Sequence, residues 1–490
     1  MNANEQRGSF LVLVAVVGLA ISMVNGCMVG PNYHPPQPTS PPAWVGVAKT
    51  TGQPSVATAQ PPELTQWWRQ FDDPTLTALV EEAVRTNLDL QLAVARLRQS
   101  RAARGVALGG LWPAVTAAGT YQRLHTAGVT PADSQQNLHL AGFDAVWEFD
   151  LFGGLRRNVE SAGANVQAAI EGIRDVQVTL VAEVALNYIQ LRGSQQEIVI
   201  AQNNLKAQQH TAEITRKRLA VGFASGLDVA IADSNVATTE SKIPVFETVA
   251  QQSIYALSVL LGRPPADLLE KLSPTGNLPS VPAKIPVGLP SDLLRRRPDI
   301  HEAEAQLHAA TAQIGVATAD LFPKFSLTGS VTWQSNLVRT WWTGASRSFG
   351  FGPSVTWPIF QGGSIVSNIR VQKALADQAF ITYQKTVLAA FQDVENALIA
   401  FANEQQHLKT LTDAVAANRK AVELSLLLYT EGQVDFLNVL VAQRSLYDSE
   451  DALVQSKTSI VTDLIALYKA LGGGWESVPT GKLDTAQGKS

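Results

Sequence analysis

The sequence is poor in cysteine, in charge and in long apolar runs. It has 490 residues and one cysteine, so no disulfide can form within the chain. Charged residues make up only 16% and the formal net charge is −4, which leaves no positive excess for nucleic acid or another polyanion. After residue 24, no apolar run approaches the roughly 20 residues that a membrane-spanning helix needs. If that part of the chain crosses a membrane, it does so as strands.

The longest apolar run lies near the N-terminus, at residues 10–24, "FLVLVAVVGLAISMV". It is short for a bilayer span but has the length of a signal-peptide core. Gly26 and Cys27 follow, and they resemble the lipobox of bacterial lipoproteins, in which the signal is cleaved before the cysteine and the cysteine is acylated. We therefore expect Cys27 to be lipidated and to anchor the chain. Neither Met28 nor Val29 is the aspartate that usually marks inner-membrane retention, so outer-membrane sorting is expected. An ordinary signal peptide or an uncleaved anchor helix is the alternative.

The chain repeats itself at an offset of 210 residues. The matching residues and segments are Leu111-Trp112-Pro113 with Leu321-Phe322-Pro323, Trp147 with Trp357, Gly222 with Gly432, Leu227-Asp228-Val229 with Leu437-Asn438-Val439, and Leu261-Gly262 with Leu471-Gly472. Because separated landmarks share one offset, the sequence predicts an internal duplication.

Each half has the same order of predicted elements. A helical stretch comes first, over residues 73–109 and 291–320. A strand pair follows, as in "FSLTGSVTW" from Phe325, where apolar and polar residues alternate. Such strands fit a membrane barrel with a wet interior, although a soluble sandwich strand alternates in the same way.

Two proline-free stretches, residues 154–219 and 363–429, come after the strands. Their apolar residues recur at coiled-coil steps, and more than 60 residues at 1.5 Å each would make roughly 100 Å of helix. Each stretch ends at a glycine-containing turn, after which a second helix is expected to return to Leu261 or Leu471.

Four strands per chain are too few for a membrane barrel, which needs about eight because an open edge leaves backbone groups unpaired in lipid. We therefore predict an α+β membrane protein in which three copies form a 12-stranded β-barrel continuous with a 12-helix α-barrel. The predicted segments are a signal peptide at 1–26, a lipidated tether and wrap at 27–72, repeat one at 73–262, a linker at 263–290, repeat two at 291–472 and a tail at 473–490. The Pro-rich residues 35–62 are expected to be an extended tether.

Several segments of the sequence resemble those of the TolC-like outer-membrane factors, in the lipoprotein branch that serves tripartite drug-efflux pumps. They are "CMVGPNYHPP" from Cys27, "WWRQFDDPTL" from Trp67, "WEFDLFGGLRRNVESA" from Trp147, "GLPSDLLRRRPDIHEAEAQLHAATAQIGVATADLFP" from Gly288 and "FQGGS" from Phe360. The resemblance implies a homotrimeric exit channel in the outer membrane. Its implied partners are a periplasmic adaptor and an inner-membrane transporter, and its iris-like gate would lie at the periplasmic helix tips.

The same resemblance assigns the site residues. Asp228 and Tyr429 match a pair that helps hold the closed state, and Leu437, Asn438 and Val441 fall at the constriction ring. Several relatives have aspartates at the last two positions, so the ring is neutral here and strong cation selection is not expected. Asp435, one turn away, is the remaining predicted gate residue and would partly substitute for the missing charge. The alternative for Leu437 and Val441 is coiled-coil packing. The adaptor-contact turns are Val221, Gly222 and Phe223, and Glu431, Gly432 and Gln433.

Catalysis has little support in the sequence. The nearest thing to a metal-ligand cluster is His301, Glu304 and His308 on one helical face, which a polar helix surface also explains. We expect no enzyme activity, no metal and no cofactor beyond the lipid on Cys27. The alternatives to drug efflux are a channel for protein secretion or metal-ion efflux, and a periplasmic coiled-coil lipoprotein that acts as a spacer.

Overall fold

The computed structural model describes residues 28–60, 63–125 and 135–477. The predicted signal peptide and Cys27 lie outside these residues, as does most of the predicted tail. The chain divides into two compact units. The strand unit comprises the described residues of Met1–Gln37, Arg96–Ala169 and Glu302–Gln384, and the helix unit those of Pro38–Ala95, Ile170–His301 and Lys385–Ser490.

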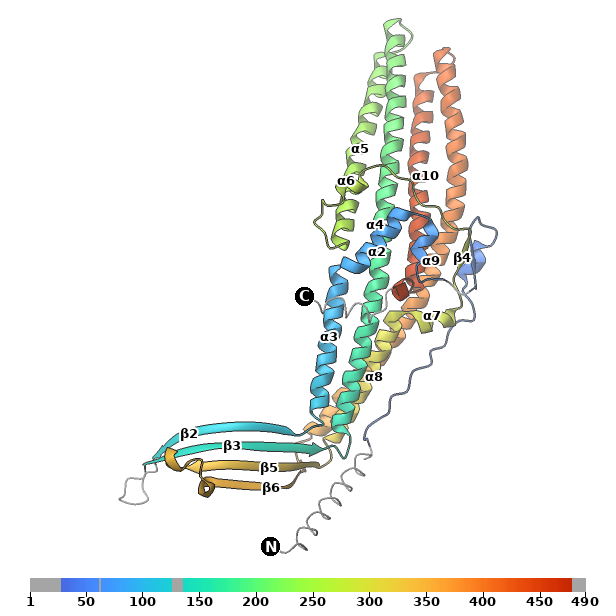
Figure 1. The fold of residues 1–490 in the computed structure, drawn as a ribbon. Helices are drawn as coiled ribbons and strands as arrows, with labels where there is room; N and C mark the ends of the chain where they lie inside the picture. Colours follow the sequence, from blue (N-terminus) through green and yellow to red (C-terminus); the bar gives the residue numbers. More distant parts are fainter. Residues whose placement is uncertain (1–27, 61–62, 126–134, 478–490) are drawn as a thin grey trace. The chain divides into compact units, whose positions relative to one another are not determined.

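The strand unit contains one antiparallel sheet of four strands in the order β2-β3-β5-β6 (Figure 1). The strands are β2 (Ala114–His125), β3 (Gln135–Phe149), β5 (Lys324–Ser335) and β6 (Arg347–Thr356). The two predicted strand pairs join through β3 and β5, where Phe143 lies opposite Val331. β6 ends at Thr356, two residues before Pro358, which has no N–H to donate to a ladder. Two short helical turns, η3 (Val338–Thr340) and η4 (Gly344–Ser346), lie between β5 and β6.

The long helices occupy the stretches that the sequence predicts. They are α4 (Gly154–Ala220) with α5 (Gly226–Leu260), and α9 (Ser364–Thr430) with α10 (Phe436–Ala470). α4 and α9 both have 67 residues, α5 and α10 both have 35, and each later helix starts 210 residues after its counterpart. No helix in the described ranges combines the length and the apolar character needed to cross a membrane.

The predicted helical stretch at the start of each half is confirmed, and in both halves it is broken into two helices. Repeat one has α2 (Pro74–Thr86) and α3 (Leu88–Gly109), and repeat two has α7 (Pro290–Arg296) and α8 (Pro298–Ala319). α3 and α8 again start 210 residues apart and have 22 residues each. The helices end where a side chain or a proline competes with the helical backbone bonds.

The two breaks use different residues for the same contact. Asn87 accepts a hydrogen bond from the Leu90 amide at 2.9 Å and donates through Nδ2 to the Leu260 carbonyl at 2.9 Å. Its counterpart Arg297 precedes a proline and donates to the Ala470 carbonyl at 3.0 Å. Each returning helix is therefore tied at its C-terminal end to the break.

The Pro-rich N-terminal segment is packed, which corrects its prediction as an extended tether. It contains η1 (Gly46–Thr50) and β1 (Val56–Thr58), and β1 pairs in parallel with β4 (Lys284–Pro286). Trp44 is 6% exposed and packs edge-on against Phe391. Glu395 accepts hydrogen bonds from the amides of Val45 and Gly46 at 2.7 and 2.8 Å. The burial of Trp44 and the hydrogen bonds to Glu395 thus hold this segment in place, although its proline content favours an extended, unpacked chain.

The helix unit has an aromatic core beside the end of α10. η2 (Trp67–Phe71) buries Trp67, Trp68 and Phe71, and Trp67 stacks on Tyr468 with ring centroids 5.1 Å apart. The Tyr468 hydroxyl donates to Gln70 at 2.7 Å. The short α6 (Leu269–Leu272) and η5 (Trp475–Ser477) complete the unit's elements. Large aromatic side chains of this kind contribute much of the apolar area that stabilises a core.

The Arg297 contact gives a stability prediction for the helix unit. The Arg297 side chain is 13% exposed and pairs with Asp299 at 2.7 Å and Asp393 at 3.1 Å. Arg297→Met leaves both carboxylates without this partner, and we expect a loss of about 3 kcal/mol in the free energy of unfolding. Arg69→Met is the matched control, because Arg69 and Glu81 are 54% and 47% exposed and such a pair contributes less than about 1 kcal/mol. Denaturant midpoints of the detergent-solubilised variants measure the difference, and equal midpoints would contradict it.

Candidate functional site

The turn between α4 and α5 is built on Gly222 and closed by a capping box. Gly222 has φ +81°, and the Phe223 amide donates to the Arg218 carbonyl at 2.8 Å. Ser225 caps α5: its hydroxyl accepts from the Asp228 amide at 3.1 Å, while the Asp228 carboxylate accepts from the Ser225 amide at 2.8 Å. The first structural role of Asp228 is therefore to start α5.

The equivalent turn between α9 and α10 has the same backbone but different capping chemistry. Gly432 has φ +79°, and the Gln433 amide donates to the Leu428 carbonyl at 2.9 Å. Asp435 is at the N-cap of α10, where its side chain makes no capping hydrogen bond in the described chain. Asn438 stands where repeat one has Asp228, and its amide donates to the Asp435 carbonyl at 3.1 Å. The second turn thus lacks the reciprocal carboxylate bond of the first.

Tyr429 joins the two hairpins near these turns. It is 3% exposed and belongs to an apolar cluster with Ala212, Ala232, Phe436 and Val439. The guanidinium carbon of Arg218 lies 4.6 Å from the centre of the Tyr429 ring, and Arg218 also donates to the Thr430 carbonyl at 3.0 Å. Arg218 is not among the gate residues predicted from the sequence, where its signal is a basic residue in the last turn of α4.

The predicted pair of Asp228 and Tyr429 is not joined by a hydrogen bond within the described part of this chain. The Asp228 carboxylate is occupied by Ser225, and the Tyr429 hydroxyl is buried and has no hydrogen-bond partner there. A buried phenol hydroxyl usually has a hydrogen-bond partner, so the Tyr429 hydroxyl is available to a hydrogen bond from outside these residues. The role of the pair in closure stays a prediction.

The predicted constriction residues lie on the exposed face of α10. Leu437 is 62% exposed and Val441 is 57% exposed, whereas Phe436 and Val439 on the opposite face are buried in the Tyr429 cluster. Asn438 is exposed beside Leu437. Coiled-coil packing within the chain is therefore excluded for Leu437 and Val441. These two residues form an apolar i, i+4 pair that is open to solvent or to another copy.

The two predicted adaptor-contact turns differ in polarity. Val221 and Phe223 in the first turn are 66% and 72% exposed, and Leu227 beyond them is 67% exposed. In the second turn Glu431 and Gln433 are exposed and hydrogen-bonded to each other at 2.9 Å. One turn therefore presents apolar surface and the other a polar pair, which sequence repetition alone does not indicate.

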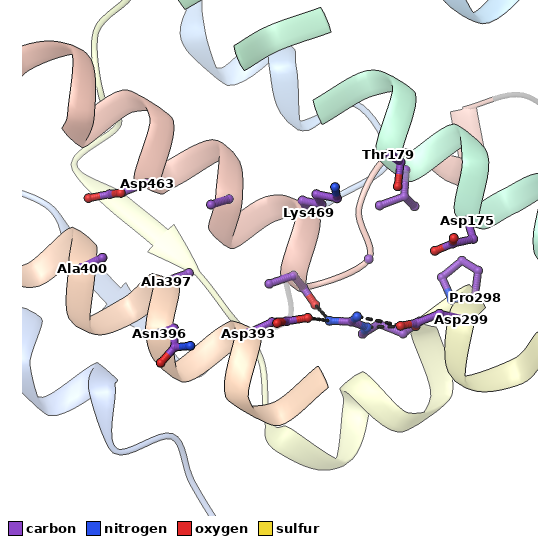
Figure 2. A pocket seen from close by; sticks show the side chains of 15 residues that line it. Asp175, Thr179, Pro298, Asp299, Asp393, Asn396, Ala397, Ala400, Asp463 and Lys469 are labelled. Carbon is purple, nitrogen blue, oxygen red and sulfur yellow. Dashed lines mark hydrogen bonds and ion pairs between the residues drawn. The ribbon is translucent and has the colours of Figure 1, made fainter. Parts of the chain in front are cut away.

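A separate cavity of about 470 Å³ lies around Arg297 in the helix unit (Figure 2). Four aspartates line it: Asp175, Asp299, Asp393 and Asp463. Burial raises the pKa of Asp175, with Asp299 adding to the effect. Burial, with the nearby Glu404 charge, raises the pKa of Asp463 to about 6. Arg297 forms ion pairs with Asp299 and Asp393, and the dashed lines in Figure 2 run to these two labelled carboxylates, so two of the four aspartates belong to an ion-pair network.

The candidate metal ligands have separate partners. The His301 ring is hydrogen-bonded through Nε2 to the Arg295 carbonyl at 2.9 Å, and Glu304 accepts a hydrogen bond from the Tyr33 hydroxyl at 3.3 Å. His308 lies 3.0 Å from a Glu160 oxygen. In the described ranges, no group of three or more His, Cys, Asp or Glu side chains has the geometry to hold a metal ion.

Comparison with known proteins identifies the family. The model of the family described as "Outer membrane efflux protein" matches residues 79–263 and again residues 289–473, two segments that start 210 residues apart. The chain is 34% identical to "Probable efflux pump outer membrane protein TtgC" of Pseudomonas putida over 94% of this chain and 96% of that protein. It is 31% identical to "Nodulation protein T" of Rhizobium leguminosarum bv. trifolii over 93% and 96%.

Among solved structures, the outer-membrane channel OprN superposes with a TM-score of 0.85 at 36% identity, over 92% of this chain and 100% of that one. Sequence and fold comparisons therefore agree over nearly the whole chain. The chain belongs to the outer membrane efflux protein family, a family of efflux channels and not of enzymes.

Proposed function

We propose that this chain forms a homotrimeric exit duct of a tripartite efflux pump, anchored by a lipid on Cys27. The duct passively conducts small toxic compounds that a periplasmic adaptor and an inner-membrane transporter deliver. The observation that carries the proposal is the four-stranded sheet, whose edge strands β2 and β6 each have one side that pairs with no other strand among the described residues. Unpaired backbone groups are costly in lipid, and three copies supply the twelve strands that close a barrel.

The side chains of the sheet support a membrane setting. Phe349, Phe351 and Val355 on β6 are 69%, 84% and 59% exposed, which would be unfavourable in water. From Phe325 to Trp333, β5 advances eight residue steps, which span about 26 Å along the strand, close to the roughly 25 Å apolar band of outer-membrane barrels.

Tryptophans lie at both ends of the strands, where aromatic girdles of membrane barrels are found. At the end that adjoins α3 and α4, Trp147 donates through Nε1 to the Leu111 carbonyl at 3.0 Å, and Trp112 is 73% exposed. At the other end, Trp341 donates to the Trp333 carbonyl at 3.1 Å and stacks on Trp342. This placement supports a sheet bounded by two interfaces.

The gate is proposed at the turns between the long helices. Exposed Leu437, Asn438 and Val441 would line the constriction when copies meet, and Arg218 with Tyr429 would hold the two hairpins of each copy together. A ring of these three residues carries no charge, so it has no strong preference for cations. This favours the export of mixed small organic compounds over a channel specialised for metal ions.

The first test is the native mass of protein extracted from outer membranes in a mild detergent. We expect a trimer, because four strands cannot close alone. We also expect acyl mass on each Cys27. A monomer in gentle detergent would contradict the closed barrel, and a trimer without acyl mass would contradict only the lipid anchor.

Charge introduced at the constriction should change ion selectivity. Val441→Asp in every copy places a ring of carboxylates at the proposed constriction, and we expect the cation-to-anion permeability ratio in planar bilayers to rise several-fold. Val245→Asp is the matched control, because Val245 on α5 is 59% exposed but lies far along the helix from the turn. The proposal fails for Val441 if both variants give the same reversal potential.

Loss of the Arg218 contact should favour the open state. Arg218→Met removes a cation–π contact and a charged hydrogen bond, together roughly 1–2 kcal/mol, so we expect about a tenfold rise in open-channel occupancy. Arg216→Met is the control, because Arg216 forms an ion pair with the exposed Asp233. Single-channel recordings measure both variants. Equal occupancies would rule out Arg218 as a closing contact.

A further inference from the structure

Residues 28–33 lie along the beginning of α4 in the strand unit, and we call them the N-terminal strap. The Val29 amide donates to the Phe152 carbonyl at 3.0 Å. Arg157 returns two hydrogen bonds: Nε donates to the Val29 carbonyl at 3.2 Å, and Nη2 donates to Asn32 Oδ1 at 2.7 Å. The strap is therefore held through both its backbone and a side chain.

Arg157 is buried to an extent that is unusual for an arginine, with 2% of its surface exposed. Its third partner is Glu160, at 2.8 Å. A buried guanidinium is costly unless its donors are paired, and two of the three acceptors named here belong to the strap. Removal of the strap would take away two of these acceptors from the guanidinium. The site around Arg157 is thus complete only when the strap is in place.

Three glycines allow the strap to lie directly on the backbone beneath it. Gly30 has φ +84°, and a Cβ there would lie 2.5 Å from the Gly315 Cα of α8. A Cβ on Gly315 would lie 2.7 Å from Arg157 Cγ, and one on Gly153 would lie 2.8 Å from Met28 Cγ. No side chain fits at these contacts, so the close approach depends on glycine on both sides.

The far end of the strap is tied to the same network. The Tyr33 ring stacks on His308 with centroids 4.3 Å apart and planes 12° apart, and its hydroxyl donates to Glu304 at 3.3 Å. His308 lies 3.0 Å from Glu160, the carboxylate that also pairs with Arg157. Contacts from α4 and α8 therefore hold both ends of a six-residue segment.

We propose that Arg157 is a positioning residue that holds the N-terminal strap, and thereby the lipid anchor, beside the chain's own sheet. This inference rests on the proposed function, in which Cys27 is acylated and the sheet lies in the membrane. Cys27 lies outside the described residues, but its peptide bond to Met28 places it next in the chain to the strap. Acyl chains on Cys27 then start at the strap, and the partner of this surface is the acyl layer of the bilayer.

The surroundings of the strap indicate where the anchor enters the membrane. Phe152, whose carbonyl holds Val29, stacks on Phe322 with centroids 4.5 Å apart. At the same end of the strands Trp357 donates to the Leu321 carbonyl at 3.0 Å and is 57% exposed. Aromatic side chains of this kind favour the membrane–water interface. These contacts place the strap at the level at which the strands end, where the proposal has the anchor enter the bilayer.

The test follows a nitroxide on His34→Cys, at an exposed position just after the strap. If Cys27 is acylated, this is the chain's single free thiol, and intact mass verifies both the acyl group and the label count. Protein in liposomes is compared as Gly30→Ala and as Gly52→Ala. Both glycines have nearly the same φ, +84° and +83°, but a Cβ on Gly52 meets nothing within 4 Å. Asn32→Ala removes one acceptor without adding a clash, and it replaces Gly30→Ala if that variant does not assemble.

Two readouts separate positioning from simple stabilisation. The mobility of the nitroxide, taken from its spectrum, reports whether the strap is docked. The ratio of the collision rates of the nitroxide with oxygen and with a water-soluble nickel chelate reports the depth of the label in the bilayer. We expect an immobile label at one depth near the lipid headgroups for the parent and for Gly52→Ala. For Gly30→Ala we expect a correlation time about tenfold shorter and a broad depth distribution.

Each other outcome overturns a defined part of the inference. A mobile label in the acylated parent means that the strap is not docked, although the lipid anchor of the proposed function stands. An immobile label in Gly30→Ala and Asn32→Ala removes the positioning role. A change in mobility without a change in depth reduces the strap to a structural contact. A docked strap on unacylated protein overturns the anchor and the lipid part of the proposed function together.

Discussion

Backbone hydrogen bonding at the edges of the four-stranded sheet is the constraint on which the rest of this structure depends. Within the part of the chain that the structure describes, β3 and β5 are paired on both sides, whereas β2 and β6 are each paired on one side only. An apolar sheet with open edges is stable in lipid only when another strand pairs with each edge. The exposed apolar residues of β6, the equal lengths of the long helices and the exposed face of α10 all have a simple explanation if copies of the chain complete one another.

Duplication has preserved the backbone of the two halves and changed their chemistry. Asn87 and Arg297 occupy equivalent breaks, and each donates to the terminal carbonyl of a returning helix. Only Arg297 adds ion pairs, which turns the second break into a charged network. At the turns, the Ser225–Asp228 capping box has Asp435 and Asn438 as its counterpart. A repeated fold thus carries two unlike halves, which gives each copy one apolar turn and one polar turn.

The N-terminal region shows how composition can mislead. Proline and small polar residues between 35 and 62 predict a tether, yet Trp44 is buried and β1 pairs with β4. The preceding strap is held more tightly still, because Arg157 is buried and needs its acceptors. In both places a few specific contacts outweigh the average tendency of the segment, and those contacts come from residues more than 100 positions away in sequence.

The sequence by itself determined the repeat, the strand pairs, the long helical hairpins and the family, because periodicity, proline-free runs and shared words are local properties that one chain displays directly. The bonds from Asn87 and Arg297 to the returning helices lay outside its reach, since each needs a carbonyl that is brought close only by folding. Tertiary structure alone decided that Tyr429 and Arg218 join the hairpins, and that Leu437 and Val441 face outward. The physical reason is that side-chain partners and burial depend on distant segments, which a helical or strand period does not specify.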